Sequence, residues 1–315
     1  MWNFFLLIII YSGIYALMAI GQNSITGYTG MLSLCHAGFF CIGCYTTAIM
    51  CKTFGLSWWL SIPVAALLSG IVGFLLGLPT LRLKGDYLCI ATLGFGEIIR
   101  NVATNLNPVG YQSIPKATLF GYQFSSRNKL AFIVLVWAFV IFFYLVFRQL
   151  AHSRIGRALT AIREDEVAAQ SNGINVTTYK IAAFTLGAAV GGVSGCLMTA
   201  YSQTVNPGTF TFMVSVMVLC MVVLGGMGNG LGVILGAFII QLISYFPQLT
   251  GLSNVIPPQA KQIIFGLILV VMMIFCPQGI LGRDKYRYGD PRTTGEKIRG
   301  LVSSFSKKGK KEAAK

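Results

Sequence analysis

The sequence predicts an all-α protein, a polytopic transmembrane bundle of about nine helices, and three observations lead to this fold class. Of the 315 residues, 55% are hydrophobic and 10% are charged, whereas soluble domains have about 25% charged residues. The apolar residues form long continuous runs, and the 80 residues from Ile181 to Ala260 include no Asp, Glu, Lys or Arg. A soluble core of this size could not bury so much apolar surface, and a membrane β-barrel would show alternation over about ten residues instead.

Nine apolar stretches have roughly the 20 residues that a membrane-spanning helix needs. In chain order they are residues 3–21, 31–51, 57–79, 87–106, 130–148, 180–201, 210–228, 231–247 and 261–277. The second and fourth are rich in glycine and polar residues, which favours a broken or re-entrant helix, and the last is short. We therefore expect about eight to ten membrane segments. The first stretch is expected to remain as a span, because it lacks a positively charged start and a small-residue cleavage site.

Basic residues set the predicted orientation, since loops rich in Lys and Arg stay in the cytoplasm. Two regions hold most of them: residues of about 149–179, called the charged segment below, and a tail at 283–315 with 11 basic and four acidic residues. Four apolar stretches separate these regions, so both lie on one side. The sequence thus predicts a transmembrane domain at 1–282, a cytoplasmic tail at 283–315 and an external N-terminus.

Composition excludes several classes of function. Of the net charge of +15, the tail after the last span alone contributes +7, and contact with anionic membrane lipid is expected there rather than contact with nucleic acid. The eight cysteines lie mostly in apolar runs and the chain has two histidines, so we expect helix packing and no metal site. No GxxxxGK[ST] motif and no Ser-His-Asp set occurs, so the chain is expected to be no enzyme and to bind no ATP or other cofactor itself.

Glycines repeat every four residues in several spans. Gly187, Gly191 and Gly195 form one such series, and four-residue spacing places small residues on one helix face, where a neighbouring backbone can approach closely. The motif "LGGMGNGLG" (224–232) lacks the Lys-Ser/Thr ending of a phosphate loop and is predicted to be a tight turn between two spans.

The stretch "LGFGEIIR" (93–100) places Glu97, an acidic residue, inside a predicted span. A charge near the bilayer centre costs about 2.5–3.5 kcal/mol on insertion scales. Arg100 lies on the same helix face and is placed to pair with Glu97, while Gly94 and Gly96 are expected to weaken the helix. Two interpretations stay open: a charged residue that lines a transport pathway, or a purely structural ion pair.

A second candidate region is "GMLSLCHAGFF" (30–40), where Ser33 and His36 begin a span. A histidine inside the membrane can relay protons or bind a ligand, and it can equally be a neutral residue of the packed interior.

The charged segment has the pattern of a short amphipathic helix. Ile155, Leu159, Ile162 and Ala169 recur at helical spacing, and Gly173 is a typical helix stop. The segment is therefore predicted to be a cytoplasmic helix, either an ordinary solvated one or a docking element for a partner.

Five motifs in this order carry a resemblance to a known family. They are "TGYTGMLSLCHAGFFCIGCYTTA", "LRLKGDYLCIATLGFGEIIRN", "SRIGRALTAIREDEVAAQSNGI", "LGGMGNGLGVILGA" and "PQGILG". Together they resemble the membrane permease subunits of bacterial branched-chain amino acid ABC importers of the LivM type, over about residues 20–285.

The resemblance implies a permease of the bacterial inner membrane that works with partner subunits. The implied partners are a second related permease, two cytoplasmic ATPase subunits that use the ATP, and an external substrate-binding protein. The charged segment resembles the coupling loop that contacts an ATPase, which often has an E-A-A-x-x-x-G pattern. Here Glu166 lies one place before the usual acidic position. The expected coupling residues are Arg157, Arg163, Glu164, Glu166, Ala168, Ala169 and Gly173.

The expected cargo is a branched-chain amino acid, namely leucine, isoleucine or valine, and the candidate pathway residues are Ser33, His36, Glu97 and Arg100. Similar permeases import urea or short amides, so this substrate class stays open. A self-sufficient secondary transporter is a further alternative, although it would need coupling-ion residues in the membrane and would leave the charged segment without a role.

Overall fold

The computed structural model describes residues 2–80, 83, 85–115, 117–119, 122–124, 129–249 and 279–280. All of them belong to one compact unit, Met1–Arg283, and residues 284–315 form a second unit. The predicted ninth span at 261–277 and the predicted tail at 283–315 lie outside the described residues. The division into a membrane domain and a tail domain therefore stays a prediction.

Eight long helices occupy the positions of the first eight predicted spans. They are α1 (Trp2–Thr29), α2 (His36–Lys52), α3 (Trp58–Thr80), α4 (Asp86–Leu106), α5 (Lys129–His152), α8 (Val176–Ser202), α9 (Phe212–Gly225) and α10 (Gly230–Leu249). Four of these, α1, α3, α5 and α8, are long and apolar enough to cross a membrane alone, and α9 and α10 are shorter apolar helices. The predicted polytopic helical bundle is confirmed.

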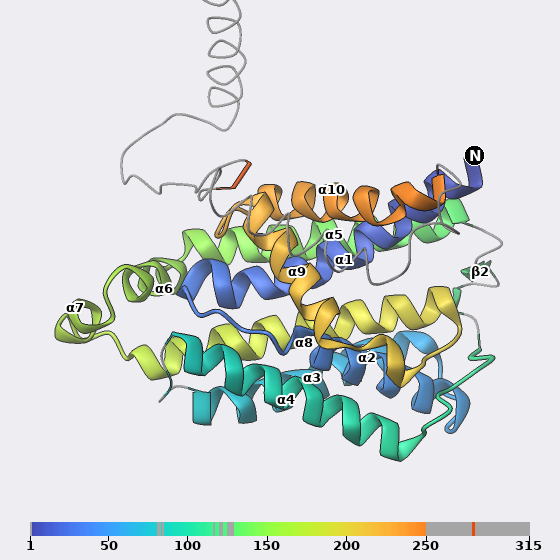
Figure 1. Cartoon of the computed structure of the whole chain (residues 1–315), viewed down its shortest axis with the longest axis horizontal. Coiled ribbons are helices and arrows are strands. Elements are labelled where there is room, and N and C mark those ends of the chain that lie inside the picture. The colour runs from blue at the N-terminus through green and yellow to red at the C-terminus, as the bar shows by residue number, and fades with distance from the viewer. Residues whose placement is uncertain are drawn as a thin grey trace, which may run out of the picture. The chain divides into compact units, whose positions relative to one another are not determined.

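Helix α8 lies between the other long helices and packs against α1, α2 and α3. Figure 1 shows the long helices running alongside one another, with α5 and α10 on one side of α1 and with α3 and α4 on the other side of α8. The predicted glycine contacts occur at these crossings. A Cβ atom added to Gly187 would lie 2.7 Å from the Gly21 carbonyl oxygen, and one added to Gly191 would lie 3.0 Å from Phe39. Only a missing side chain permits such an approach.

The two spans predicted to be broken or re-entrant differ from each other. The second begins with a non-helical segment, Gly30–Cys35, and becomes helical at His36. The fourth, α4, is an unbroken helix through Gly94 and Gly96, so the expected break there is wrong. Gly96 is compatible with the helix because it lets α4 approach α2: a Cβ atom at this position would lie 3.5 Å from the Cys35 Cα.

The region between α4 and α5 contains a small hairpin that the all-helical expectation did not include. Strands β1 (Ala117–Leu119) and β2 (Tyr122–Phe124) pair antiparallel. A separate bridge joins Tyr111 to Val205, so the loop after α4 contacts the loop after α8. These two loops thus lie together at one end of the bundle.

Candidate functional site

The non-helical segment Gly30–Cys35 is held by side chains of two other helices. The Thr92 hydroxyl accepts a hydrogen bond from the Leu34 backbone N–H at 3.0 Å. The Gln22 side chain donates to the Ser33 carbonyl at 2.6 Å. Buried backbone groups outside a helix need hydrogen-bond partners from elsewhere in the protein. Helices α1 and α4 supply these partners.

The beginning of α2 is tied to a third helix. The Ala37 backbone N–H, one of the first in α2, donates to the Ser215 hydroxyl of α9 at 3.0 Å. The first N–H groups of a helix have no partner within it, and Cys35 at the cap position provides no side-chain hydrogen bond. Ser215 therefore satisfies one of these groups and fixes α9 against the start of α2.

Ser33 and His36 are both fully buried in this arrangement. The Ser33 hydroxyl lies 3.2 Å from the Cys35 sulfur. The His36 ring packs edge-on against Phe39, with ring centroids 5.5 Å apart. Neither ring nitrogen has a hydrogen-bond partner among the described residues. Both residues lie in the packed interior between helices, and their assignment to the pathway stays a prediction.

Glu97 and Arg100 form the predicted ion pair on α4. The guanidinium Nε and Nη2 atoms each lie 2.7 Å from Glu97 Oε2. The two side chains are 32% and 31% exposed, respectively. Glu97 lies nine residues before the end of α4 at Leu106, which corresponds to about 14 Å along a helix that rises 1.5 Å per residue. The pair thus lies well inside the helix and still reaches the surface of this chain.

A small hollow with room for about one water molecule lies beside Glu97. Helices α2, α4 and α9 contribute to it, together with the residues that precede α2 and α9. The lining residues are Leu34, Ala37, Leu93, Gly96, Glu97, Phe210, Phe212 and Ser215. One carboxylate, one hydroxyl and apolar side chains line this hollow, which in this conformation is far smaller than the sites of about 300–1,000 Å³ that hold small molecules.

The charged segment forms two helices instead of the single one predicted. They are α6 (Arg154–Glu164) and α7 (Glu166–Ser171). Asp165 separates them in an extended conformation, and its carboxylate accepts hydrogen bonds from the Val167 and Ala168 N–H groups at 2.9 and 3.0 Å. A carboxylate that caps a new helix in this way ends the preceding helix. The predicted stop at Gly173 is confirmed, because its φ angle is +78°.

The apolar side of the charged segment packs inside this chain. Leu159, Ile162 and Ala169 are 2%, 4% and 3% exposed, whereas Ile155 is 43% exposed. Ile162 and Ala169 form a small core with Val176 at the start of α8. This apolar stripe is therefore not available to a partner, since the segment folds back on its own bundle.

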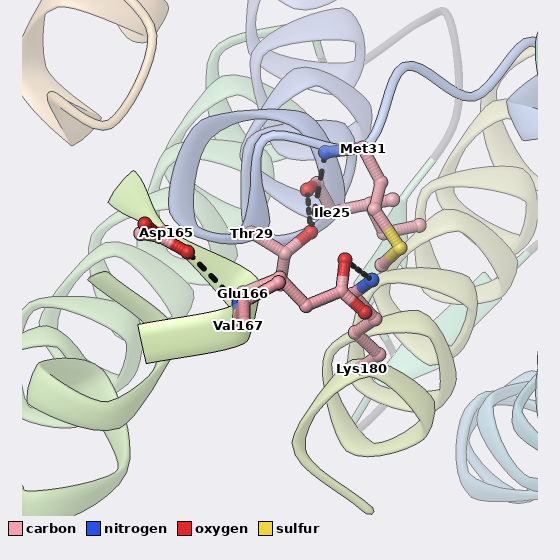
Figure 2. A network of polar contacts seen from close by, with 7 residues as sticks. All are labelled: Ile25, Thr29, Met31, Asp165, Glu166, Val167 and Lys180. Atoms are coloured by element: carbon pink, nitrogen blue, oxygen red, sulfur yellow. Dashed lines mark hydrogen bonds and ion pairs between the residues drawn. The ribbon is translucent and has the colours of Figure 1, made fainter. Parts of the chain in front are cut away.

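Glu166 joins the charged segment to α8. Its carboxylate lies 2.9 Å from the Lys180 ammonium, and the Lys180 side chain is 8% exposed. Figure 2 shows this pair next to the end of α1, where Thr29 contacts Ile25 and Met31. Glu166 is thus engaged within the chain.

Arg163 joins the same segment to α1 and to the turn between α9 and α10. Its Nη1 donates to the Gly27 carbonyl, one of the last carbonyls of α1, which have no partner within the helix. A Cβ atom at Gly228 would lie 3.4 Å from the same Nη1. The Asn23 side chain accepts a hydrogen bond from the Gly228 N–H at 2.9 Å. The predicted turn around Gly228 is confirmed. Arg163, on α6, binds the end of α1 and lies beside this turn.

Other residues of the charged segment point outward. Arg157, Glu164, Ala168 and Gly173 are exposed. The exposed surface also includes Val167, which is 68% exposed and which the sequence analysis did not select. The only sequence signal for an exposed Val167 is its place as an apolar β-branched residue in the first turn after the helix-capping Asp165.

Within the described part of the chain, no group of three or more His, Cys, Asp and Glu side chains could hold a metal ion. The described cysteines are free thiols, most of them buried.

A bundle of long helices, four of them apolar and long enough to cross a membrane alone, is the architecture of a multi-pass membrane protein. The chain matches the family "Branched-chain amino acid transport system / permease component" over residues 4–273 and belongs to it. It is 39% identical over 294 residues to the permease protein LivM of Salmonella typhimurium, a match that covers 85% of this chain and 68% of the relative.

Two further relatives widen this comparison. The LivM permease protein of Escherichia coli is 38% identical over 294 residues, with 85% of this chain and 68% of the relative covered. The LivH permease protein of the same organism is 26% identical over 292 residues, with 86% of this chain and 92% of the relative covered. No solved structure matches the chain significantly.

Proposed function

We propose that this chain is the membrane permease subunit of an ATP-driven ABC importer that moves branched-chain amino acids into the cell. The observation that carries the proposal is the clamped charged segment: Arg163 and Glu166 fix it to the ends of α1 and α8, while Val167 and Ala168 stay exposed. A rigidly attached surface can transmit movement from a docked subunit to the helices. The high-affinity branched-chain amino acid transport systems named for the LivM relatives support the choice of cargo.

The proposed complex contains a second, related permease, two cytoplasmic ATPase subunits and an external substrate-binding protein. In this arrangement the protein lies in the bacterial inner membrane with its charged segment and C-terminus in the cytoplasm. The ATPase would contact the exposed surface formed by Ile155, Arg157, Val167 and Ala168. Val167 and Ile155 offer apolar area, and neighbouring charges restrict which partner fits.

The transport pathway would pass beside the hollow at Glu97. A carboxylate in an otherwise apolar lining would attract the ammonium group of an amino acid, and the aromatic and aliphatic walls would tolerate its side chain. Because the hollow is small in this conformation, the cargo would enter only when α2, α4 and α9 move apart. Glu97 is the residue that we expect to meet the cargo, with Arg100 as its resting partner.

Reconstitution of the complete complex in lipid vesicles tests this function. We expect ATP-dependent uptake of leucine, isoleucine and valine that requires the binding protein, and no uptake without ATP. Uptake of urea or acetamide in place of the amino acids would refute the proposed cargo. Uptake by this chain alone, driven by an ion gradient without ATPase subunits, would refute the importer class.

A further inference from the structure

Several helices of the described bundle expose long faces, and those of α3 and α5 are apolar throughout. Every exposed residue of α3 between Trp58 and Pro79 is apolar, and the same holds for α5 between Leu130 and Val146. Leu67, Ile71 and Phe74 of α3 and Val134, Ile141 and Phe142 of α5 are all at least 46% exposed. Such surfaces suit the hydrocarbon interior of a bilayer.

The exposed face of α4 differs from these two. It includes the Glu97–Arg100 pair, each side chain about a third exposed, and the exposed amides of Asn101 and Asn105. In the described chain, α4 is also not among the helices apolar enough to cross a membrane alone. Ionisable and amide side chains within membrane helices face protein or water rather than lipid. The α4 face therefore has a neighbour other than lipid.

Gly94 indicates what kind of neighbour this is. A Cβ atom added to Gly94 would meet no atom within 4 Å, so this glycine makes room for no neighbour among the residues that the structure describes. Gly96, two residues on, packs against α2. Glycine weakens a helix, and on a membrane helix it typically lets a second helix approach. Ile90 and Ile98 lie one helical turn before and after Gly94 and are 67% and 56% exposed, which gives a close-packing surface.

We propose that the exposed face of α4 is the contact surface for the second permease subunit. Gly94 is the point of closest approach, Ile90 and Ile98 pack on either side, and Asn101 and Asn105 hydrogen-bond to the partner. This inference rests on the proposed function, because it requires a paired permease. A related chain is the occupant, rather than a second copy, since Escherichia coli has both a LivM and a LivH relative that match this sequence over most of its length.

One consequence concerns the hollow. Glu97 lines it and also lies on the exposed α4 face, so the partner permease would form the missing wall beside the carboxylate. The site would then be complete only in the paired complex.

The test replaces Gly94 by leucine in the full complex, with Ala138→Leu as the matched control. Ala138 is a small exposed residue on the apolar face of α5, and both substitutions add the same side chain to open surface. We expect the Gly94→Leu chain to insert at the wild-type level, with a thermal midpoint no lower than that of the wild type when purified alone, since leucine favours the helix more than glycine does. Its recovery of epitope-tagged second permease should fall about tenfold, while Ala138→Leu recovers the normal amount.

A photo-crosslinking residue at Ile98 identifies the neighbour directly, with Phe142 of α5 as its control position. Mass spectrometry of the irradiated complex should find the Ile98 adduct on the second permease and only lipid adducts at Phe142. Adducts between two copies of this chain, or lipid adducts alone at Ile98, would overturn the proposal. If the wild-type chain pairs and transports while Gly94→Leu behaves like Ala138→Leu, only this inference fails. If the wild-type chain recovers no second permease, the proposed function fails with it.

Discussion

The Lys180 ammonium lies 2.9 Å from the Glu166 carboxylate and fastens α7 to the first turns of α8. Lys180 is largely buried, and Glu166 is about a quarter exposed. An ion pair in such a place holds its geometry, because either charge alone would lack a partner in a poorly hydrated environment. Together with the Arg163–Gly27 hydrogen bond, the pair attaches the charged segment to the bundle.

Replacement of Lys180 by methionine should impair coupling more than replacement of both partners. The single change leaves Glu166 without its cation and should lower the free energy of unfolding by roughly 1–3 kcal/mol, less than for a fully buried pair because Glu166 is partly solvated. The combined variant Glu166→Gln, Lys180→Met should recover part of this loss. Thermal unfolding of the purified chain and ATP hydrolysis stimulated by loaded binding protein measure both effects. Equal losses in the single and double variants would contradict this account.

The stability of Gly173 variants should depend on how well the new residue tolerates the backbone conformation at this position, and not on the volume of its side chain. Its φ angle is +78°, and a Cβ atom there would meet nothing within 4 Å. Gly173→Ala should therefore cost about 1 kcal/mol of stability, and Gly173→Val more, whereas Gly173→Asn should cost less because asparagine tolerates the left-handed region. Denaturant unfolding of the three variants gives this order. A penalty that rises only with side-chain volume would show that the glycine serves packing instead.

Glu97→Gln should reduce uptake of leucine by about tenfold or more, since a hydrogen bond to a charged group contributes about 1.5–3 kcal/mol. The amount of complex in the membrane should stay normal, because the side chain is partly exposed. The double variant Glu97→Gln, Arg100→Gln separates two roles. Recovery of transport in it would indicate that Glu97 only neutralises Arg100, whereas a persistent defect is expected if Glu97 meets the cargo.

Ala168→Glu and Val167→Glu should uncouple the complex without disturbing the fold. Both side chains point outward, so neither substitution buries a charge within this chain. We expect weaker co-purification of the ATPase subunits, while the second permease is retained. Gln170→Glu, at another exposed position of α7, is the control for added charge. Wild-type co-purification in all three variants would remove this surface from the coupling mechanism.

Cysteine labelling tests the predicted orientation. Ser57, in the loop between α2 and α3, and Ser171, at the end of α7, are both exposed. On a cysteine-free background, Ser57→Cys should react with a membrane-impermeant maleimide in intact spheroplasts. Ser171→Cys should react only after the membrane is permeabilised. The reverse pattern would invert the whole topology.

Local rules predicted much of this structure. The four-residue spacing of Gly187 and Gly191 indicated close helix contacts, and the three-residue spacing of Glu97 and Arg100 indicated their pair; both depend on one helix alone. The hydrogen bond of Arg163 could not be predicted in this way, because its acceptor, Gly27, lies 136 residues earlier in the chain. The uninterrupted course of α4 through Gly94 and Gly96 also depends on tertiary packing, which outweighs the low helix propensity of glycine.

The irregular segment before α2 has a consequence for how the protein is made. Helix α2 has 17 residues, about 26 Å at 1.5 Å per residue, and the hydrocarbon layer is about 30 Å thick. The hydrogen bond that fixes its first turn comes from Ser215, a residue synthesised 178 positions later than Ala37. During translation, the Ala37 amide therefore has to wait for this partner until α9 has been made. The last third of the chain thus completes a part of the protein that the ribosome produced much earlier.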